Sequence, residues 1–275
     1  MKHQKFSYIF IFFLAISNIL SQEIKFYGEA KAGGIIIGQG KNIKAARLNE
    51  KPLIVDKSGT FIFGFDRNAK GSFTLNIKLT NKKTLKYEYE IEKRDYGEQS
   101  LVIQKKYIRP PKRELKRIKN ETRIIKTARK KIGKVKTALY SAGFSYPLDS
   151  IKVTGNFGVQ RILNNEPHNI HNGVDFEGAE GDSVYAITDG IVRLAGENFY
   201  YNGNFVLLDH GQGLSSIYLH LSKIFVKKNQ KVKKGELIGL VGSTGRSTSP
   251  HLHLGVQWFN KRIDPMSLFD IKELN

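Results

Sequence analysis

The feature of this sequence that most limits its fold is the alternation of apolar and polar residues in short runs. The clearest run covers residues 73–79, where single polar residues separate four apolar ones: Phe73, Leu75, Ile77 and Leu79. Residues two apart share one face of a β-strand, so this run predicts a strand with one buried face. Similar runs, broken by Gly, Asn and Asp turn residues, fill residues 23–104 and predict a small N-terminal β-sandwich there.

Residues 146–275 have the same character, and we expect a second β domain in them. Asp189-Gly190 and His210-Gly211 each stand between two apolar runs, where they would form the turns of two hairpins. We expect no helix after Gly143. The chain as a whole is therefore predicted to be mainly β.

Residues 105–145, between the two β regions, carry the pattern of a long helix. Pro110 and Pro111 suit a helix start, and apolar residues follow at steps of three and four: Leu115, Ile118, Thr122, Ile125, Ala128, Ile132, Val135 and Leu139. This segment also holds most of the excess positive charge. Residues 105–136 contain 15 Lys+Arg against 2 Asp+Glu, whereas the chain from residue 137 onward contains 13 of each. We expect a basic helical linker whose apolar stripe packs on a neighbouring domain.

The charged face of this linker has two interpretations. It is either a solvated helix face or a surface that binds an anionic wall or membrane. A nucleic-acid partner is excluded, because the charge lies on a linker and no aromatic residues accompany it as a stacking platform. The sequence does not indicate an oligomeric state.

Residues 1–22 have the order of a secretory signal peptide. Lys2 and Lys5 precede an apolar run over residues 8–16, and small or polar residues follow it. The run is short for a membrane-spanning helix, so we expect a secreted protein of the periplasm or cell envelope. Because residues 18–21 match a cleavage site poorly, an uncleaved N-terminal membrane anchor is the alternative.

The chain contains no cysteine, which excludes disulfides and thiolate ligands, so any bound metal must be held by His, Asp or Glu. All histidines except His3 lie between residues 168 and 253. His251 and His253 are two apart in an apolar run, so both imidazoles would lie on one face of a strand.

His171 and Asp175, four apart, offer a second pair of possible ligands. Three nitrogen or oxygen ligands with an open fourth position are what catalytic zinc requires. His171, Asp175 and one histidine of the H-x-H pair supply that set. The other histidine of the pair, and His220 if its strand lies alongside, would be placed for proton transfer.

The strings "HNGVDF", "YLHLS" and "SPHLHL" occur in this order, with an H-x3-D, a Y-x-H-L and an H-L-H motif. In this respect residues 146–269 resemble the lysostaphin-type zinc metallopeptidases, family M23, also called LytM domains. The resemblance implies a two-sheet antiparallel β-fold with a groove, a single Zn²⁺ ion, and hydrolysis of peptide bonds in bacterial peptidoglycan. It therefore assigns a peptidase domain to residues 146–275.

The resemblance also implies roles for individual residues. His171, Asp175 and His253 match the zinc ligands, and His220 and His251 match the two catalytic histidines. We expect His251 to act as general base and His220 to stabilise the oxyanion or protonate the leaving amine, although these two roles could be exchanged.

The alternative function is a non-catalytic LytM-like module that binds the wall or activates a separate amidase. Such regulators typically lack zinc ligands, whereas this chain retains all five site residues. One departure is Gly255, which follows "HLHL" where the family commonly has Glu. The missing carboxylate could weaken the orientation of a ligand histidine.

Three further residues lie near these motifs. Arg161 matches a basic position common near the family groove, where it would form an ion pair or contact substrate. We expect His210 to be structural or to line the groove, and His168 to border the site.

Overall fold

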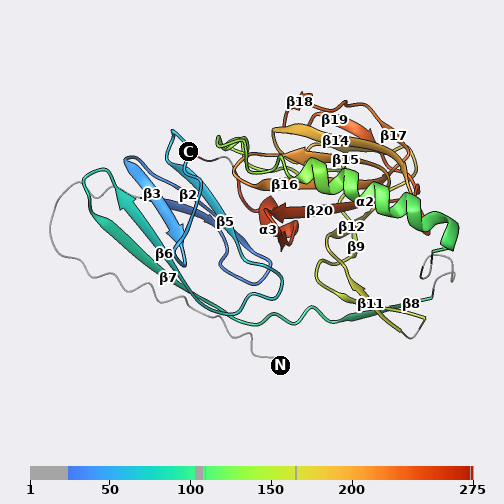
Figure 1. The fold of residues 1–275 in the computed structure, drawn as a ribbon, viewed down its shortest axis with the longest axis horizontal. Helices are drawn as coiled ribbons and strands as arrows, with labels where there is room; N and C mark the ends of the chain where they lie inside the picture. Colours follow the sequence, from blue (N-terminus) through green and yellow to red (C-terminus); the bar gives the residue numbers. More distant parts are fainter. Residues whose placement is uncertain (1–23, 103–107, 109, 165, 273, 275) are drawn as a thin grey trace.

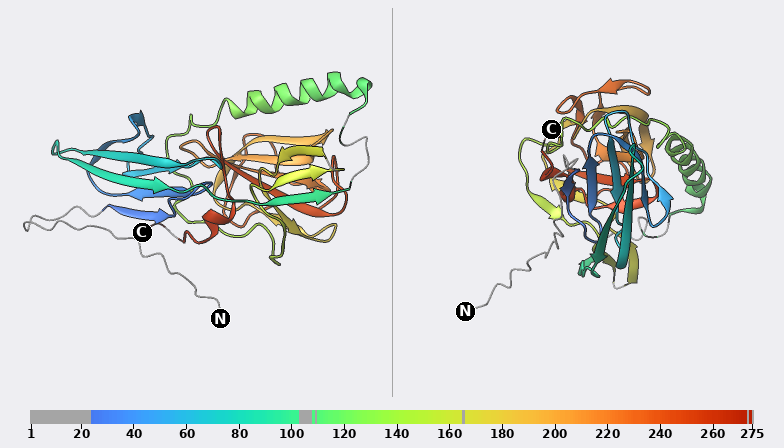
Figure 2. Two further views of the ribbon diagram at one scale, coloured as in Figure 1. Left: turned by 90° about the horizontal axis from the view of Figure 1, so that it is seen from below. Right: turned by 90° about the vertical axis from the view of Figure 1, so that its left-hand side faces the viewer.

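The computed structural model describes residues 24–102, 108, 110–164, 166–272 and 274. Two mainly β regions lie next to each other along the long axis, and one helix runs beside the second of them (Figures 1 and 2). The predicted signal peptide, residues 1–22, lies outside the described residues. Within these ranges no helix has both the length and the hydrophobicity needed to span a bilayer.

The N-terminal region contains two antiparallel sheets. The first has the order β1-β2-β5 and the second the order β4-β3-β6-β7. The sheets face each other through aromatic residues, because Phe26 packs on Tyr87 at 4.9 Å and Phe63 packs on Tyr89 at 5.8 Å between ring centroids. The strand bounds are β1 Lys25–Gly28, β2 Ile35–Gln39, β3 Ile43–Leu48, β4 Lys51–Pro52, β5 Thr60–Gly64, β6 Gly71–Leu79 and β7 Thr84–Ile91. We call this two-sheet region the sandwich.

The C-terminal region is built on an eight-stranded antiparallel sheet of order β18-β14-β15-β16-β20-β12-β9, with β21 paired to β20. A smaller sheet has the order β13-β19-β17. The bounds are β9 Val153–Gly155, β12 Val174–Glu177, β13 Ser183–Tyr185, β14 Gly190–Phe199, β15 Gly203–Asp209, β16 Leu214–Leu221, β17 Lys223–Ile224, β18 Lys231–Val232, β19 Leu237–Leu240, β20 His251–Trp258 and β21 Lys261–Ile263. The prediction of a mainly β, antiparallel fold is confirmed.

Two local predictions in this region are wrong. Asp189-Gly190 does not turn a hairpin, because β13 pairs with β19 while β14 pairs with β15. A short helix, α3 (Met266–Phe269), follows Gly143, although no helix was expected there. The hairpin at His210-Gly211 does form, between β15 and β16.

A third sheet joins residues from both sides of the linker. Its order is β11-β10-β8, with β8 Glu98–Leu101, β10 Gln160–Leu163 and β11 Glu166–Ile170. β8 runs parallel to β10, so the last strand of the predicted sandwich leaves it and joins the C-terminal region. A parallel partner so distant in sequence leaves no mark on the local apolar pattern.

The helix is shorter than the predicted linker over 105–145. α2 covers Leu115–Arg129 after a single 3-10 turn, η1, at Lys112–Glu114. The chain then turns at Gly133, whose backbone φ of 86° is rarely adopted by residues that carry a side chain. The remaining apolar positions, Ile132, Val135 and Leu139, therefore belong to a non-helical segment that runs toward the sandwich. There the Ala138 amide donates to Asp56 Oδ2 at 3.0 Å.

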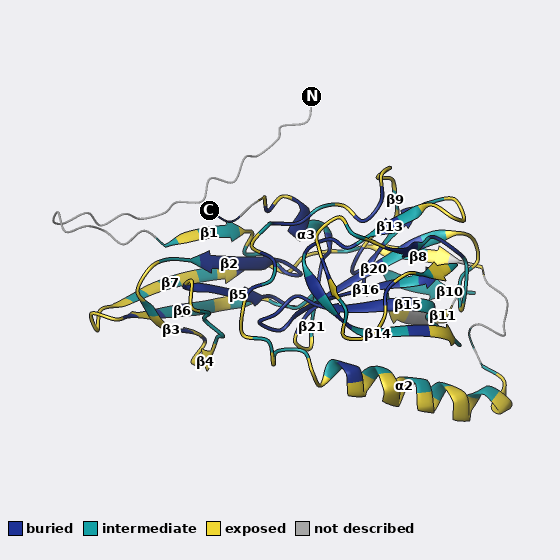
Figure 3. Cartoon of the chain, turned by 90° about the horizontal axis from the view of Figure 1, so that it is seen from above, coloured by how far each residue is buried: buried dark blue, intermediate teal, exposed yellow. Residues whose placement is uncertain are grey.

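The eight-stranded sheet has two different faces. On β20 the even-numbered residues Leu252, Leu254 and Val256 are at most 1% exposed and belong to the main core. The odd-numbered residues face the other way. On that other face α2 packs through Ile125 and Ala128 against a small apolar cluster of Phe205, Leu207, Ile217 and Leu219, while the rest of the helix is largely exposed (Figure 3).

Candidate metal centre

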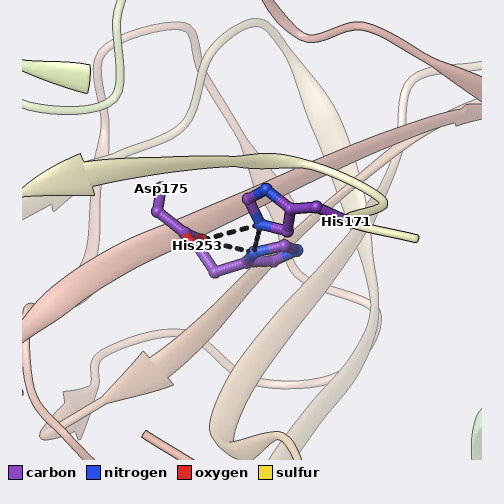
Figure 4. Close-up of side chains that lie close together, drawn as sticks. All are labelled: His171, Asp175 and His253. Atoms are coloured by element: carbon purple, nitrogen blue, oxygen red, sulfur yellow. Dashed lines mark hydrogen bonds and ion pairs between the residues drawn. The ribbon is translucent and has the colours of Figure 1, made fainter. Parts of the chain in front are cut away.

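Three side chains from neighbouring elements meet on this second face of the sheet (Figure 4). Asp175 on β12 lies opposite His253 on β20 in an antiparallel register, and His171 directly follows β11. Asp175 Oδ1 lies 2.7 Å from His253 Nδ1 and 3.0 Å from His171 Nε2, and the two nitrogens are 3.1 Å apart. These are the three residues for which the sequence predicted metal ligation, and within the described ranges their ligand atoms form a group that could hold one ion.

The donor set and its spacing fit zinc. Ligands bound tetrahedrally at 2.0–2.1 Å would lie about 3.3 Å from one another, close to the distances between these three atoms. His171 Nδ1–H donates to the Asn156 carbonyl at 2.7 Å, which leaves the lone pair of Nε2 free for a metal. Arg161 Nη2 donates to Asp175 Oδ2 at 2.7 Å and leaves Oδ1 for the ion.

The electrostatics keep the carboxyl group ionised, as a ligand must be. Burial acts to raise the pKa of Asp175, but the neighbouring His171 and His253 imidazoles hold that pKa well below its usual range. Burial is also the main cause that lowers the pKa of His253, so this imidazole is held in the neutral form that binds metals.

The outer nitrogen of His253 lies against two glycines. A Cβ at Gly173 would be 2.7 Å from His253 Nε2, and a Cβ at Gly255 would be 3.8 Å from it. Gly173 therefore allows the close approach of the imidazole. A longer side chain at position 255 would start within reach of Nε2, although its Cβ would also press on Ile217 Cγ2 at 3.0 Å. No hydrogen-bond partner for this nitrogen is found among the residues that the structure describes.

The two remaining predicted histidines lie beside the cluster. The ring centroids of His220 and His251 are 5.0 Å apart, and His251 Nε2 lies 3.9 Å from Asp175 Oδ1. The Nδ1 of His251 is 2.8 Å from the Ser249 carbonyl and that of His220 is 2.8 Å from the Thr244 carbonyl. Because a carbonyl oxygen can only accept, each Nδ1 carries the hydrogen and each Nε2 presents a lone pair.

His220 has an unusual backbone conformation. Its φ is 66°, and the β15–β16 pairing shifts register between Asn204 and Val206, opposite this end of β16. Strict alternation would put the side chains of neighbouring residues on opposite faces, yet Leu219 and His220 both line the same groove. Burial, followed by the nearby His251 and His253, lowers the pKa of His220 from 6.5 to about 3, so it is neutral at pH 7.

The cluster opens into a groove of about 1190 Å³. Its floor is formed by β12, β16 and β20, one wall by α2 through Ile125 and Arg129, and the opposite wall by residues near β8 and β11, such as Gln99 and Asn169. No described residue of the sandwich before β8 lines the groove. Loop residues 246–250 border the metal end, where Arg246 lies over the Tyr201 ring at 4.6 Å.

The other predicted residues are placed as follows. Arg161 forms an ion pair with Asp175. His210 is fully buried between the Asp189 carbonyl at 2.8 Å and Ser216 Oγ at 2.7 Å, so its contacts are structural. The backbone of His168 belongs to β11, and its side chain lies outside the description. Sequence reasoning missed Arg129 and Arg262, which also line the groove, because surface arginines are not distinguishable from lining arginines in one sequence.

The fold and this site place the C-terminal region among the metallopeptidases. Residues 169–265 match the model described as Peptidase family M23, and the match includes all five site residues. The chain therefore carries a peptidase domain of family M23, as the motif resemblance predicted.

Individual relatives agree with this assignment. The peptidoglycan DD-endopeptidase ShyA of Vibrio cholerae is 45% identical over 115 residues, which are 39% of this chain and 25% of that protein. The DD-carboxypeptidase/endopeptidase Mpg of Neisseria meningitidis is 35% identical over 122 residues, which are 44% of this chain and 28% of that protein. The chain thus spans only about a quarter of the length of these curated relatives.

A solved structure described as peptidase M23 from Pseudomonas aeruginosa is similar over a larger part of the chain. It is 26% identical with a TM-score of 0.63, and the alignment covers 88% of this chain and 96% of that one. The similarity therefore extends beyond the peptidase domain to the sandwich.

Proposed function

We propose that this protein is a zinc endopeptidase that hydrolyses peptide bonds in the stem peptides or cross-links of bacterial peptidoglycan. The observation that carries the proposal is the geometry of the five side chains. Three ligand atoms lie 2.7–3.1 Å apart, the Nε2 of His251 lies 3.9 Å from one of them, and the His220 ring lies 5.0 Å from the His251 ring. ShyA is named a peptidoglycan DD-endopeptidase, which supports peptidoglycan as the substrate class, and Mpg is named a DD-carboxypeptidase/endopeptidase, which supports peptide-bond hydrolysis.

The chemistry follows from the residues. A zinc ion held by His171, Asp175 and His253 would polarise the scissile carbonyl and make an attacking water more acidic. His251 Nε2 accepts the proton of that water, since its Nδ1 is already committed to the Ser249 carbonyl. The resulting Nε2–H then donates its proton to the leaving amine.

His220 has a different part in this proposal. Its low pKa and its bond to the Thr244 carbonyl keep it neutral, with a lone pair on Nε2. It therefore orients the attacking water as a hydrogen-bond acceptor and leaves the proton to His251. The oxyanion or leaving-group role expected from the sequence would require a proton on His220 Nε2, which burial disfavours.

The alternative of a non-catalytic LytM-like module lacks a supporting observation. Its distinguishing feature would be an incomplete ligand set, whereas His171, Asp175 and His253 are all present and converge in this chain.

The test is digestion of purified peptidoglycan by the zinc-loaded protein, with identification of the released fragments by mass. We expect about one zinc per chain, release of peptide-cleaved fragments, and loss of release in chelator. Glycine-bridge cleavage and cleavage at a D-amino-acid cross-link give fragments of different mass. A zinc-loaded protein that releases nothing, but stimulates an added amidase, would overturn the proposal in favour of the regulator.

We further propose that the protein acts in the cell envelope and that α2 contacts an anionic wall or membrane surface there. The predicted signal at residues 1–22 supports the location. The exposed Lys116, Lys119 and Lys126 of α2 support the contact.

A further inference from the structure

Two arginines lie together at the end of the groove beyond the metal ligands. Arg129 is the last residue of α2, and Arg262 is the middle residue of β21, paired with Gln257 of β20. Both side chains are half-buried, and both line the groove. Along the groove face of β20 the order is His251, His253, Gly255 and then Gln257, so the arginine pair lies further along the sheet than the metal ligands.

The charges of this pair are poorly balanced. Each guanidinium is partly removed from water, and the positive charge of Arg262 acts on Arg129. Asp66 of the sandwich attracts Arg262, and its Oδ2 accepts the Arg262 backbone amide at 3.1 Å. Among the residues that the structure describes, no hydrogen bond or ion pair is found for the Arg129 guanidinium. Two half-buried cations with one acidic neighbour form a site that an anion would stabilise.

The metal ligands and the arginine pair line one continuous groove. Gly255 and Ile217 form its floor between them. Ile125 of α2 borders the same stretch. A peptide lying along this apolar floor could therefore reach both arginines while its scissile bond lies at the metal ligands.

The other two arginines of the groove are already engaged. Arg161 pairs with Asp175 at 2.7 Å, and Arg246 packs over Tyr201 at the metal end. Arg129 and Arg262 are thus the cations placed to meet a ligand group at the far end.

We propose that Arg129 and Arg262 form a subsite that binds a free carboxylate of the substrate peptide. This inference rests on the proposed function, because it takes peptidoglycan peptides as the substrates. A cross-linked peptide keeps carboxylates at its free termini and on its acidic side chains, and a planar guanidinium binds a carboxylate through two parallel hydrogen bonds. The subsite would thereby select substrates by charge at a point away from the scissile bond.

The test compares two synthetic cross-linked muropeptide dimers, one with free carboxylates and one with the same groups as carboxamides. We expect kcat/KM of the full-length zinc protein to be about tenfold higher for the dimer with free carboxylates, mainly because its KM is lower. Arg129→Gln and Arg262→Gln should lose this preference, so that kcat/KM for the free carboxylates falls toward that for the carboxamides. Arg262→Lys should retain part of the preference. Lys126→Gln, which removes one charge from the exposed face of the same helix, should retain all of it.

Binding separates this inference from the proposed function. The affinities of both dimers are also measured with zinc-loaded His251→Ala, which keeps the three ligand residues but lacks the proposed base. A binding preference for the carboxylate dimer that disappears in His251→Ala/Arg129→Gln supports the subsite, even if no dimer is ever cleaved. Equal binding and equal cleavage of the two dimers by the parent protein would overturn the subsite and leave the peptidase intact.

Discussion

Asp175 on β12 lies directly opposite His253 on β20, and Asp175 Oδ1 is 2.7 Å from His253 Nδ1. Opposite residues of an antiparallel pair have side chains on the same face, so this register alone brings two of the three ligands together. A shift of one residue would turn Asp175 or His253 toward the core, where Leu252 and Leu254 now lie. The metal centre therefore depends on the strand register as much as on the ligand residues.

The separate roles of His251 as proton acceptor and His253 as metal ligand can be tested with two single substitutions. His253→Ala leaves two protein ligands and should lower zinc occupancy, and activity should fall with it. His251→Ala should keep the metal and lose roughly 10²–10⁴-fold in kcat, the usual range for a positioned acid or base. Zinc content by metal analysis and kcat on a soluble dimer check both outcomes.

Circular dichroism of both variants serves as the control, because a damaged β20 would imitate either result. Zinc loss in His251→Ala with retention in His253→Ala would reverse the ligand assignment. Full activity and full zinc content in both variants would make the pair structural.

Much of this site was predictable from the sequence, because period-two alternation fixes which residues of β20 share a face. The alternation correctly separated His251 and His253 from Leu252. It could not predict how His220 enters the same groove as Leu219, because that depends on a positive φ and a local register shift. The carbonyl partners of the imidazoles, those of Asn156, Thr244 and Ser249, come from backbone that carries no residue signal.

The fold, like the site, could be predicted where it depends on the local sequence pattern and could not where segments distant in sequence pair. Local pattern was sufficient for most antiparallel strands, since neighbouring strands often pair. It failed at Asp189-Gly190, where β13 pairs with the distant β19, and at β8, which pairs in parallel with β10. The helical spacing also continued past Arg129 to Leu139, but the backbone turns at Gly133 and tertiary contacts take over.

The low pKa of His220 predicts a dependence of stability on pH in metal-free protein. The pKa of His220 is about 3 in the folded state, whereas its ordinary value, taken for the unfolded state, is 6.5. Between these two pH values the unfolded state binds more protons than the folded state. Stability should therefore be constant above pH 6.5 and fall as the pH decreases toward 3, by up to about 1.4 kcal/mol per pH unit for one full proton. Urea unfolding between pH 7.5 and 4 in chelator measures this.

Burial also lowers the pKa of His210 and His253, so these two histidines make stability fall with decreasing pH in the same way. The variant His220→Gln is therefore needed to isolate the contribution of His220. The slope of the free energy of unfolding against pH should be smaller in His220→Gln than in the parent. Parallel slopes would mean that His220 is not held neutral by the fold.

Gly255 offers a test of how the ligand His253 is oriented. Gly255→Glu would place a carboxylate near His253 Nε2, because a Cβ at position 255 would lie 3.8 Å from that nitrogen. An acceptor on the outer nitrogen of a ligand histidine typically changes metal affinity by about 10–100-fold, so we expect tighter zinc binding. Competition with a chelator of known affinity measures this change, and Gly255→Gln is the control of similar size without the charge. Equal zinc affinity in all three proteins would show that His253 needs no further partner.

The exposed basic face of α2 gives the last prediction. Lys116, Lys119 and Lys126 point to solvent, while Ala128 of the same helix packs on the sheet. If this face binds an anionic surface, binding of the protein to purified wall or to anionic vesicles should weaken as salt rises, because exposed charges are screened over ~10 Å at 0.1 M. The triple change to Gln should weaken binding at low salt in the same way and should leave cleavage of a small neutral dimer unchanged. Sedimentation with wall material from 50 to 500 mM salt, about the range in which screening acts, provides the measurement. Binding that does not respond to salt, or that survives the triple change, would mean that the charged face of α2 is simply solvated.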